Sequence, residues 1–275
     1  MLTIVASMEQ ELVLLRKQLE GRADASEPEA SVAADLRVIG VGRSAAQTAV
    51  NALLQRQGMN GDRSPSSSPS SSPSMERLLL LGFAGGVDPA IGAGTLVLSS
   101  RYYRQEPAGE YLAPGPEMFR QGVRAATAAG ETWVNSDSLT VDHLVATPEA
   151  KRAIRFRYPV GIVEMEDYWV AAAAREAGVP FLSARVVLDA ADQALPGYLL
   201  GLSRSRTRAA VTVAVMPWRI PALLGLARRL PRAQRALTRF ATAFLGQSSE
   251  ARGVQPRANP PSPAKPAGSG GSRPG

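Results

Sequence analysis

Cysteine is absent from the sequence, and histidine occurs only once, at His143. Without cysteine the chain can form neither disulfide bonds nor thiolate metal sites. A single histidine argues against a histidine-rich metal site and against a Ser-His-Asp triad, and a lone histidine is more often structural than catalytic. We therefore expect no metal centre and no cofactor, so that any catalysis rests on other side chains.

Long apolar runs are also missing. No stretch of 18 apolar residues occurs, which predicts that no segment spans a membrane. The N-terminal stretch MLTIVASMEQE lacks a basic region, and its apolar part is too short for a secretory signal peptide. With 45% hydrophobic and 20% charged residues, the composition is typical of a soluble globular protein, which we expect in the cytoplasm.

Acidic residues are lacking in one C-terminal region. No aspartate or glutamate lies between Asp192 and Glu250, whereas nine arginines lie from Arg204 to Arg239. The basicity behind the formal net charge of +7 therefore belongs to this region. Nucleic acid, an anionic membrane surface or a solvated helix would each explain it. Nucleic acid is not expected as a partner, because aromatic and base-reading elements are sparse.

The same region predicts an amphipathic helix. Apolar residues share one arc of the helical wheel and arginines share the opposite arc. The apolar arc consists of Ala233, Leu237, Phe240, Ala241 and Phe244, and the basic arc of Arg232, Arg235 and Arg239. One interpretation is an interfacial helix that places residues 217–246 on an anionic membrane, peripherally on its inner face. The alternative is a helix packed on the core with a solvated basic face.

Two low-complexity segments interrupt and end the folded part. Residues 59–75 are rich in serine and proline and are predicted to be a disordered insert, and residues 247–275 a disordered tail. The rest is expected to form one domain over residues 1–246, of which 203–246 is the Arg-rich helical region. Strand and helix patterns alternate along this domain, and the strands are nearly continuous apolar runs. This favours an α/β fold with helices on both faces of a buried sheet.

Glycines and acids gather at the predicted strand ends, where ligands bind in such folds. The stretches GVGRSAA (40–46) and GFAGG (82–86) are either plain turns or places where backbone approaches a ligand. Glu164 and Glu166 could share a strand face and bind hydroxyls, or stabilise the N-terminus of the next helix. Asp189 and Asp192 could each cap a helix or act as a general acid after burial has raised the pKa.

Five segments, in order along the chain, carry a resemblance: ASMEQE (6–11), GVGRSAA (40–46), GFAGG (82–86), VEMED (163–167) and ARVVLDAAD (184–192). Together they resemble the nucleoside phosphorylase and nucleosidase superfamily, most closely the methylthioadenosine/S-adenosylhomocysteine nucleosidase type. The resemblance implies a three-layer α/β/α sandwich with a mixed central sheet, and a homodimer. It also implies a purine nucleoside N-glycosidase or phosphorylase that acts on a small-molecule or lipid nucleoside.

The resemblance assigns roles to several residues. Asp189 matches the aspartate that protonates the purine at N7, and Glu11 matches the carboxylate that activates water in the hydrolases. Glu166 matches the glutamate that binds the ribose hydroxyls, and Met165 the methionine that packs on the sugar. The acids Asp189 and Glu11 fit cleavage through an oxocarbenium-like transition state, because this reaction needs one protonated and one ionised group.

Further substrate contacts follow from the same resemblance. Glu164 and Arg185 match residues near the attacking nucleophile. Gly85 and Phe83 belong to the glycine turn at the site, and His143 falls near the aromatic residue that stacks on the base. Arg43 is a candidate anion ligand should phosphate be a co-substrate. The Gly-Asp-Pro phosphate loop of the phosphorylases is absent, however, which favours water as the nucleophile.

Departures from the nucleosidases point to an unusual substrate. The bulky residues Phe83, Asp167, Tyr168 and Trp169 replace small ones, which argues against ordinary small-substrate recognition. The stretch ADQALP and the Pro-then-Arg-rich helix resemble the hopanoid-associated phosphorylase branch, which implies adenine removal from adenosylhopane in hopanoid biosynthesis. The alternatives are a methylthioadenosine/S-adenosylhomocysteine or futalosine nucleosidase, and a non-catalytic nucleoside-binding or membrane-associated protein.

Overall fold

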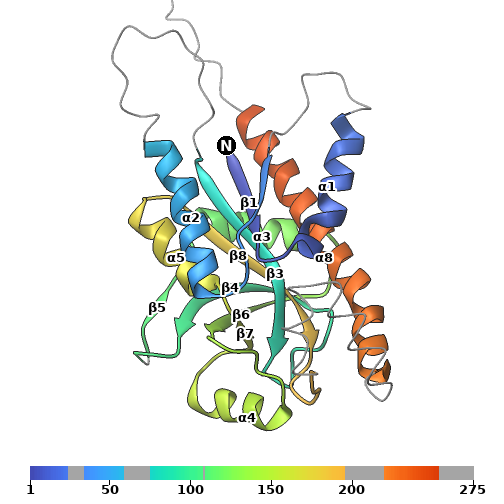
Figure 1. Ribbon diagram of the computed structural model, residues 1–275. Helices are drawn as coiled ribbons and strands as arrows, with labels where there is room; N and C mark the ends of the chain where they lie inside the picture. The colour runs from blue at the N-terminus through green and yellow to red at the C-terminus, as the bar shows by residue number, and fades with distance from the viewer. Residues whose placement is uncertain (24–33, 59–74, 108, 196–219, 254–275) are drawn as a thin grey trace, which may run out of the picture.

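The computed structural model describes residues 1–23, 34–58, 75–107, 109–195 and 220–253 (Figure 1). Eight strands form one sheet in the order β2-β1-β3-β7-β6-β4-β5, and β8 pairs with both β3 and β4. The strands are β1 (Leu2–Ala6), β2 (Ala34–Val38), β3 (Arg77–Gly86), β4 (Leu96–Arg104), β5 (Tyr111–Leu112), β6 (Trp133–Thr140), β7 (Ile162–Glu164) and β8 (Phe181–Asp189). The helices are α1 (Glu9–Ala23), α2 (Arg43–Gly58), α3 (Pro116–Ala128), α4 (Pro148–Arg157), α5 (Asp167–Glu176) and α8 (Ile220–Gly253).

Five of the strands close into a ring. β3 pairs in parallel with β8 and antiparallel with β7, while β4 pairs antiparallel with β8 and in parallel with β6. The parallel pair of β6 and β7 completes the circle. β1 and β2 extend the sheet in parallel beyond β3. The predicted α/β fold with a mixed central sheet is therefore confirmed.

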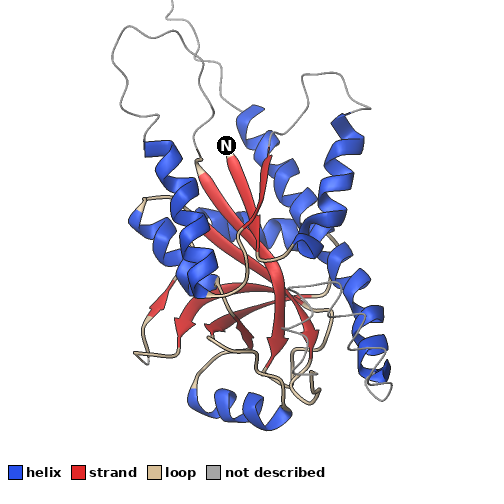
Figure 2. Ribbon diagram, viewed as in Figure 1, coloured by secondary structure: helices blue, strands red, loops and turns tan. Residues whose placement is uncertain are grey.

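Alternate residues of β3 face two separate cores. Leu79 and Leu81 belong to the core that includes side chains of α1, α3 and α8, whereas Leu78 and Leu80 belong to the core that includes α2 and α5. The helices accordingly cover both sides of the sheet (Figures 1 and 2). A strand that is apolar on both faces needs cover on both, which is why the run RLLLLGFAGG predicts a three-layer arrangement.

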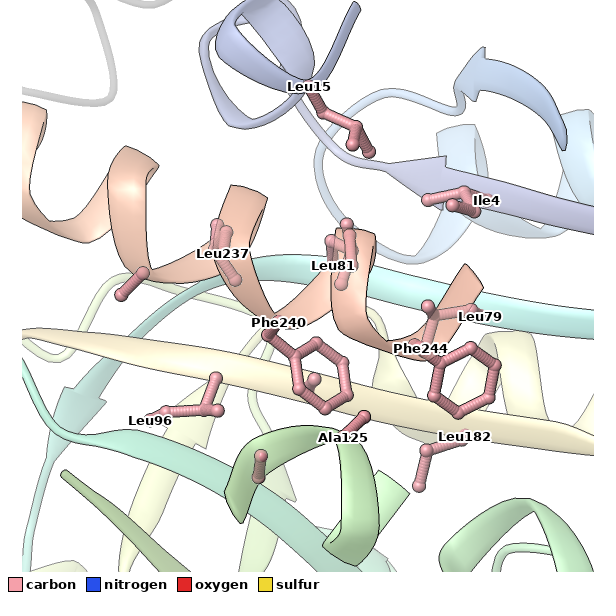
Figure 3. Close-up of a cluster of buried hydrophobic side chains, with 14 of the residues drawn as sticks. Ile4, Leu15, Leu79, Leu81, Leu96, Ala125, Leu182, Leu237, Phe240 and Phe244 are labelled. Atoms are coloured by element: carbon pink, nitrogen blue, oxygen red, sulfur yellow. The ribbon is translucent and has the colours of Figure 1, made fainter. Parts of the chain in front are cut away.

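The long helix α8 belongs to the first of these cores. It contacts α1, α3 and β8, and the rings of Phe240 and Phe244 lie over Leu79, Leu81 and Leu182 (Figure 3). The whole predicted apolar arc is buried, and the opposite face is exposed at Arg232, Arg235 and Arg239. The interpretation of a helix packed on the core is therefore confirmed over residues 232–246. The interpretation that this apolar arc inserts into a membrane is wrong, because the arc is already buried within the protein.

The N-terminal end of the predicted membrane segment and the residues directly before it are not described. Residues 217–219 lie outside the described part of the chain, as do residues 203–216 of the predicted Arg-rich region. Among the helices that are described, none combines the length and the apolar character needed to cross a bilayer.

Several element boundaries differ from the sequence-based expectation. The strands β5 and β6 were not predicted, because WVNSDSLT carries four polar residues between its apolar ends. Met75, placed in the insert 59–75, is buried in the core, and residues 59–74 lie outside the described part. α8 continues to Gly253, beyond the predicted boundary at 246. Finally, β7 ends at Glu164, so Glu166 stands at the start of α5 rather than on the strand.

Candidate active site

A cavity of about 270 Å³ lies at the carboxyl ends of β3, β7 and β8, next to the loops that follow β1 and β2. Ligands bind at this position in α/β sheets. The cavity is lined by eight residues that the sequence singles out: Glu11, Phe83, Gly85, Glu164, Met165, Glu166, Arg185 and Asp189. These eight side chains come from segments that are up to 178 positions apart, from Glu11 to Asp189.

Two predicted site residues do not line this cavity. His143 is exposed in the loop before α4, although its neighbours Val141 and Leu144 do line the cavity. Arg43 is exposed at the start of α2, where its guanidinium lies 4.1 Å from the centre of the Trp169 ring. The structure therefore does not bring His143 to a stacking position or Arg43 to an anion site.

Arg185 is the centre of the polar end of the cavity. Its side chain is 1% exposed and donates to Asp167 at 2.7 and 2.9 Å, to Glu164 at 2.9 Å and to Glu166 at 3.3 Å. Burial disfavours its charge, but Asp167 and then the other carboxylates outweigh burial and raise its pKa. The guanidinium therefore stays charged and holds several carboxylates in fixed positions.

Asp167 is a partner of Arg185 that the sequence argument missed. It is completely buried and also accepts hydrogen bonds from the hydroxyls of Ser138 at 2.8 Å and Ser183 at 2.7 Å. These contacts explain why β6 and β8 carry serines at buried positions. A signal was present in the run FLSARVV, where Ser183 and Arg185 are the two polar residues of a predicted buried strand, because a buried hydroxyl needs a partner.

Tyr168 and Trp169 were expected to crowd the substrate, and this expectation is wrong. Both rings are buried in the core that includes α2 and α5, where they contact each other edge to face at 5.1 Å between centroids. Neither residue lines the cavity. Tyr168 and Trp169 therefore do not limit the size of the substrate, and any substrate preference depends on residues that line the cavity.

Glu164 follows the second of its two predicted alternatives, because it stabilises the start of the next helix, whereas Glu166 does not share a strand face with it. One oxygen accepts from the Thr140 hydroxyl, while the other accepts from the backbone N–H groups of Glu166 at 2.6 Å and Asp167 at 2.7 Å. It therefore stabilises the N-terminus of α5 while it lines the cavity. Burial, reinforced by the charge of Asp167, raises its pKa although Arg185 acts in the opposite direction.

Glu166 connects the site to the loop after β2. Its Oε1 accepts from the backbone N–H of Gly42 at 2.8 Å. Gly42 has a φ of +84°, a conformation that side-chain-bearing residues rarely adopt, so the glycine is required for this contact. The stretch GVGRSAA therefore approaches the site through its backbone, and Val41 lines the cavity beside it.

Glu11 is fixed by two backbone donors. It accepts from Met8 N at 2.8 Å and from Phe83 N at 2.9 Å. Burial raises the pKa of Glu11 to about 7, because the nearby charge of Arg185 only partly compensates and Glu166 adds to the increase. A carboxylate that gains and loses its proton near neutrality is suited to act as a general base.

The close approach of Glu11 and Arg185 depends on a glycine. A Cβ on Gly82 would lie 2.1 Å from Nη1 of Arg185 and 3.1 Å from Oε1 of Glu11. The first distance is far below van der Waals contact, so only glycine leaves room for the guanidinium. The glycines of GFAGG therefore serve close packing within the site.

Asp189 lies at the end of β8 and opposes α4. Its carboxylate is paired with the ammonium of Lys151, and both side chains are almost fully buried. Burial raises the pKa of Asp189 to about 6, while Lys151 and, more weakly, Arg229 act to lower it. Asp192 is exposed and does not line the cavity. No pattern in PEAKRAIRFR distinguishes Lys151 from the arginines around it, so sequence reasoning missed this residue.

The remaining wall of the cavity is largely apolar. The loops after β1 and β2, the loop before α4 and the segment after β8 all contribute, and α8 adds one residue from its N-terminal half. The apolar residues of this wall are Met8, Val41, Val141, Leu144, Val145, Val163, Leu188, Leu195 and Leu230. The cavity is therefore polar where the carboxylates meet Arg185 and apolar elsewhere, as is usual for sites that orient a small ligand.

Comparison with a family profile supports what the geometry indicates. The profile of the phosphorylase superfamily matches residues 4–212. The chain belongs to this superfamily. The resemblance to the nucleoside phosphorylase and nucleosidase superfamily found in the sequence is confirmed with it.

Solved structures of similar fold come from several bacteria. Futalosine hydrolase of Helicobacter pylori aligns with a TM-score of 0.64 at 12% identity, over 90% of this chain and 97% of the other. The 5'-methylthioadenosine/S-adenosylhomocysteine nucleosidase of Neisseria meningitidis aligns with a TM-score of 0.64 at 19% identity, over 90% and 98%. The corresponding nucleosidase of Helicobacter pylori gives 0.64 at 12%, over 90% and 97%. At these identities the similarity concerns the fold.

Proposed function

We propose that the protein cleaves the N-glycosidic bond of a 5′-modified adenosine and releases adenine. The observation that carries this proposal is one cavity lined by buried carboxyl groups of raised pKa, among them Glu11 near 7 and Asp189 near 6, with Glu164 as the third. Glycoside cleavage needs one group to protonate the leaving group and another to direct the nucleophile. Membership in the phosphorylase superfamily supports the same reaction class.

The roles are those that the resemblance implies, and the lining of one cavity by these groups supports them. Asp189 donates a proton to N7 of the base, and the electrons of the broken bond are then held by neutral adenine. Glu11 accepts a proton from the water that attacks C1′, and Glu166 binds the ribose hydroxyls beside Met165. Arg185 and Glu164 position these groups, since both oxygens of Glu164 already accept hydrogen bonds.

Water is the proposed nucleophile. Arg185, the cation that lines the cavity beside the carboxylates, is occupied by Asp167, Glu164 and Glu166. An incoming phosphate would have to compete with these carboxylates for its charge and would be repelled by them. Glu11, in contrast, is placed to take a proton from water.

We propose a lipid-like substrate such as adenosylhopane on the basis of the apolar wall. Burial of apolar surface contributes about 25 cal/mol per Å², so a long apolar 5′ substituent would gain affinity along Leu144, Leu195 and Leu230. A methylthioadenosine/S-adenosylhomocysteine or futalosine nucleosidase is the second candidate, which the similar solved structures favour.

The test is adenine release by the purified protein from methylthioadenosine and from adenosylhopane, each with and without phosphate. We expect release without phosphate and a higher kcat/KM for adenosylhopane. Release that requires phosphate would make the enzyme a phosphorylase. No release from either nucleoside would contradict the proposed function.

Leu230 of α8 provides a separate test of the apolar wall. Replacing Leu230 with Ala removes apolar contact, and changes of this size alter discrimination by about 10-fold or more. We expect the ratio of kcat/KM for adenosylhopane over methylthioadenosine to fall by this factor. Leu53→Ala, a half-buried leucine of α2 that does not line the cavity, is the control. An unchanged ratio in Leu230→Ala would exclude α8 from substrate selection.

We also propose that the exposed basic face of α8 binds an anionic membrane surface. Arg232 and Arg235 are exposed on the helix that contributes Leu230 to the cavity, so surface binding would bring the cavity towards a lipid substrate. Binding to liposomes with anionic lipid should weaken with salt and with the double change Arg232→Glu and Arg235→Glu. Arg120→Glu on α3 is the control. Equal binding by both variants would contradict the proposal.

A further inference from the structure

Lys151 is a buried lysine for which the proposed reaction has no direct role. It lies on α4, and its side chain is 0% exposed. Its ammonium donates to the carboxylate of Asp189, to Ala190 O at 2.7 Å and to Gln193 O at 2.9 Å. An ammonium has three N–H donors, so all of them are used. A buried ammonium requires such complete pairing.

These contacts all fall on the segment that follows β8. Lys151 therefore fixes the backbone of residues 189–193 as well as the carboxylate at its beginning. The hydrogen bond from Leu195 N to Ala146 O, at 2.8 Å, ties the same segment to the loop before α4. α4 thus holds the carboxyl group of Asp189 in place at the edge of the cavity.

The charged groups that face Asp189 come from two elements. α4 contributes Lys151, and α8 contributes the more distant Arg229, whose guanidinium donates to the side chain of Gln193 at 2.6 Å. β3 presents Gly85, where an added Cβ would lie 3.5 Å from Oδ2 of Asp189. Within the described residues, no second carboxylate shifts the pKa of Asp189. Its pKa is therefore set by burial, which raises it, and by these two cations, which lower it.

We propose that Lys151 is a positioning residue that makes Asp189 a stronger acid towards the leaving base. In the proposed step, the proton moves from the Asp189 carboxyl group to N7, and the N-glycosidic bond breaks with its electron pair going to the base. Water forms the new bond to C1′ and gives its proton to Glu11. Lys151 keeps its three protons and stabilises the carboxylate that forms at Asp189 as the charge develops. This inference rests on the proposed function, because it needs Asp189 to act as the acid.

The pH dependence separates this role from a merely structural one. An opposite charge in contact lowers the pKa of a carboxyl group by about one to three units. Without the ammonium, Asp189 would keep its proton to higher pH, and the optimum of a profile set by two groups moves by half of such a shift. We expect Lys151→Met to move the optimum of kcat/KM upward by about 0.5 pH units or more.

Two further variants complete this experiment. Lys151→Gln removes the charge but keeps two N–H donors, so it should shift the pH optimum in the same direction. If Lys151→Met does not fold, Lys151→Gln alone tests whether loss of the charge moves the optimum. Lys17→Met, an exposed lysine of α1, should leave the profile unchanged. A lower rate with an unmoved optimum in the neutral variants of Lys151 would overturn the proposal.

A direct titration distinguishes failure of this inference from failure of the proposed function. The pKa of Asp189 is measured by ¹³C NMR of its carboxyl carbon, assigned through Asp189→Asn, in the wild-type protein and in both variants of Lys151. A rise of about one unit or more in the variants supports the inference, and an unchanged pKa overturns it. This result is decisive even if the wild-type protein releases adenine from no nucleoside, which would refute the proposed function alone.

Discussion

At one end of the cavity, four buried carboxylates surround the single guanidinium of Arg185, whereas at the other end one carboxylate, Asp189, is held against the ammonium of Lys151. At the first end burial raises the pKa of Glu11 to about 7, Arg185 only partly opposes it, and the charge of Glu166 adds to the increase. The balanced pair at the second end restrains the pKa of Asp189 to about 6. Burial and unequal pairing thus leave two carboxyl groups that titrate near neutrality, and the proposed mechanism assigns proton acceptance to Glu11 and proton donation to Asp189.

The largest effect should come from removing the shared cation. Arg185→Met leaves Glu164, Glu166 and Asp167 buried without their partner, and loss of one member of a buried ionic group costs about 3–5 kcal/mol. We expect the free energy of unfolding, measured with urea, to fall by this amount. Arg120→Met, which breaks an exposed pair with Glu117, should cost less than about 1 kcal/mol. Equal losses in the two variants would show that the Arg185 cluster is not a buried ionic centre.

A smaller loss is expected from filling the space next to Arg185. The methyl group of Gly82→Ala would overlap the guanidinium, and overpacking of this kind costs about 1–3 kcal/mol. The same exchange at Gly21 of α1, where a Cβ meets no atom within 4 Å, is the control. It should be neutral or stabilising, since alanine favours helix. A tolerated Gly82→Ala would mean that Arg185 can move away from Glu11.

The pH dependence of stability tests the carboxylate end more finely. Folded Glu11 keeps its proton up to about pH 7, whereas the unfolded residue releases it near 4.5. The unfolded state therefore binds fewer protons in this window, and the wild-type protein loses stability as the pH rises through it. Relative to wild type, Glu11→Gln should gain up to about 3 kcal/mol between pH 4.5 and 8.

The measurement for this prediction is urea unfolding at pH 5 and at pH 8. Glu9→Gln, an exposed glutamate paired with Arg16, serves as the control and should show little change with pH. If the difference between Glu11→Gln and wild type were the same at both pH values, the pKa of Glu11 would not be raised in the folded protein.

The two ends of the cavity also differ in how well the sequence predicts them. Glu11, Glu164, Glu166 and Arg185 lie in short segments whose order and spacing resemble one family, and the structure brings all four into one cavity. Lys151 could not be found in this way, because an amphipathic basic helix gives no sign of which cation turns inward. Its burial depends on the position of α4 against the segment after β8, a contact between distant parts of the chain.

The fold shows the same division between local and distant information. The apolar run of β3 and the Thr147 cap of α4 can be recognised in the sequence, because periodicity and capping are local signals. β6 was missed, because its polar residues, among them Ser138 and Thr140, bind buried carboxylates rather than solvent. The apolar arc of α8 was compatible with packing either on a membrane or on the protein core. Only the tertiary contacts show that it packs on the core.

The most direct test of the account is the rate of adenine release as a function of pH for the wild-type protein, Asp189→Asn and Asp192→Asn. The proposed mechanism needs ionised Glu11 and protonated Asp189, so the wild-type kcat/KM should follow a bell with its optimum between pH 6 and 7. Asp189→Asn should lower kcat by about 10²–10⁴-fold, and the exposed Asp192→Asn should match wild type. Full activity in Asp189→Asn would contradict the assignment of the acid and with it the proposed mechanism.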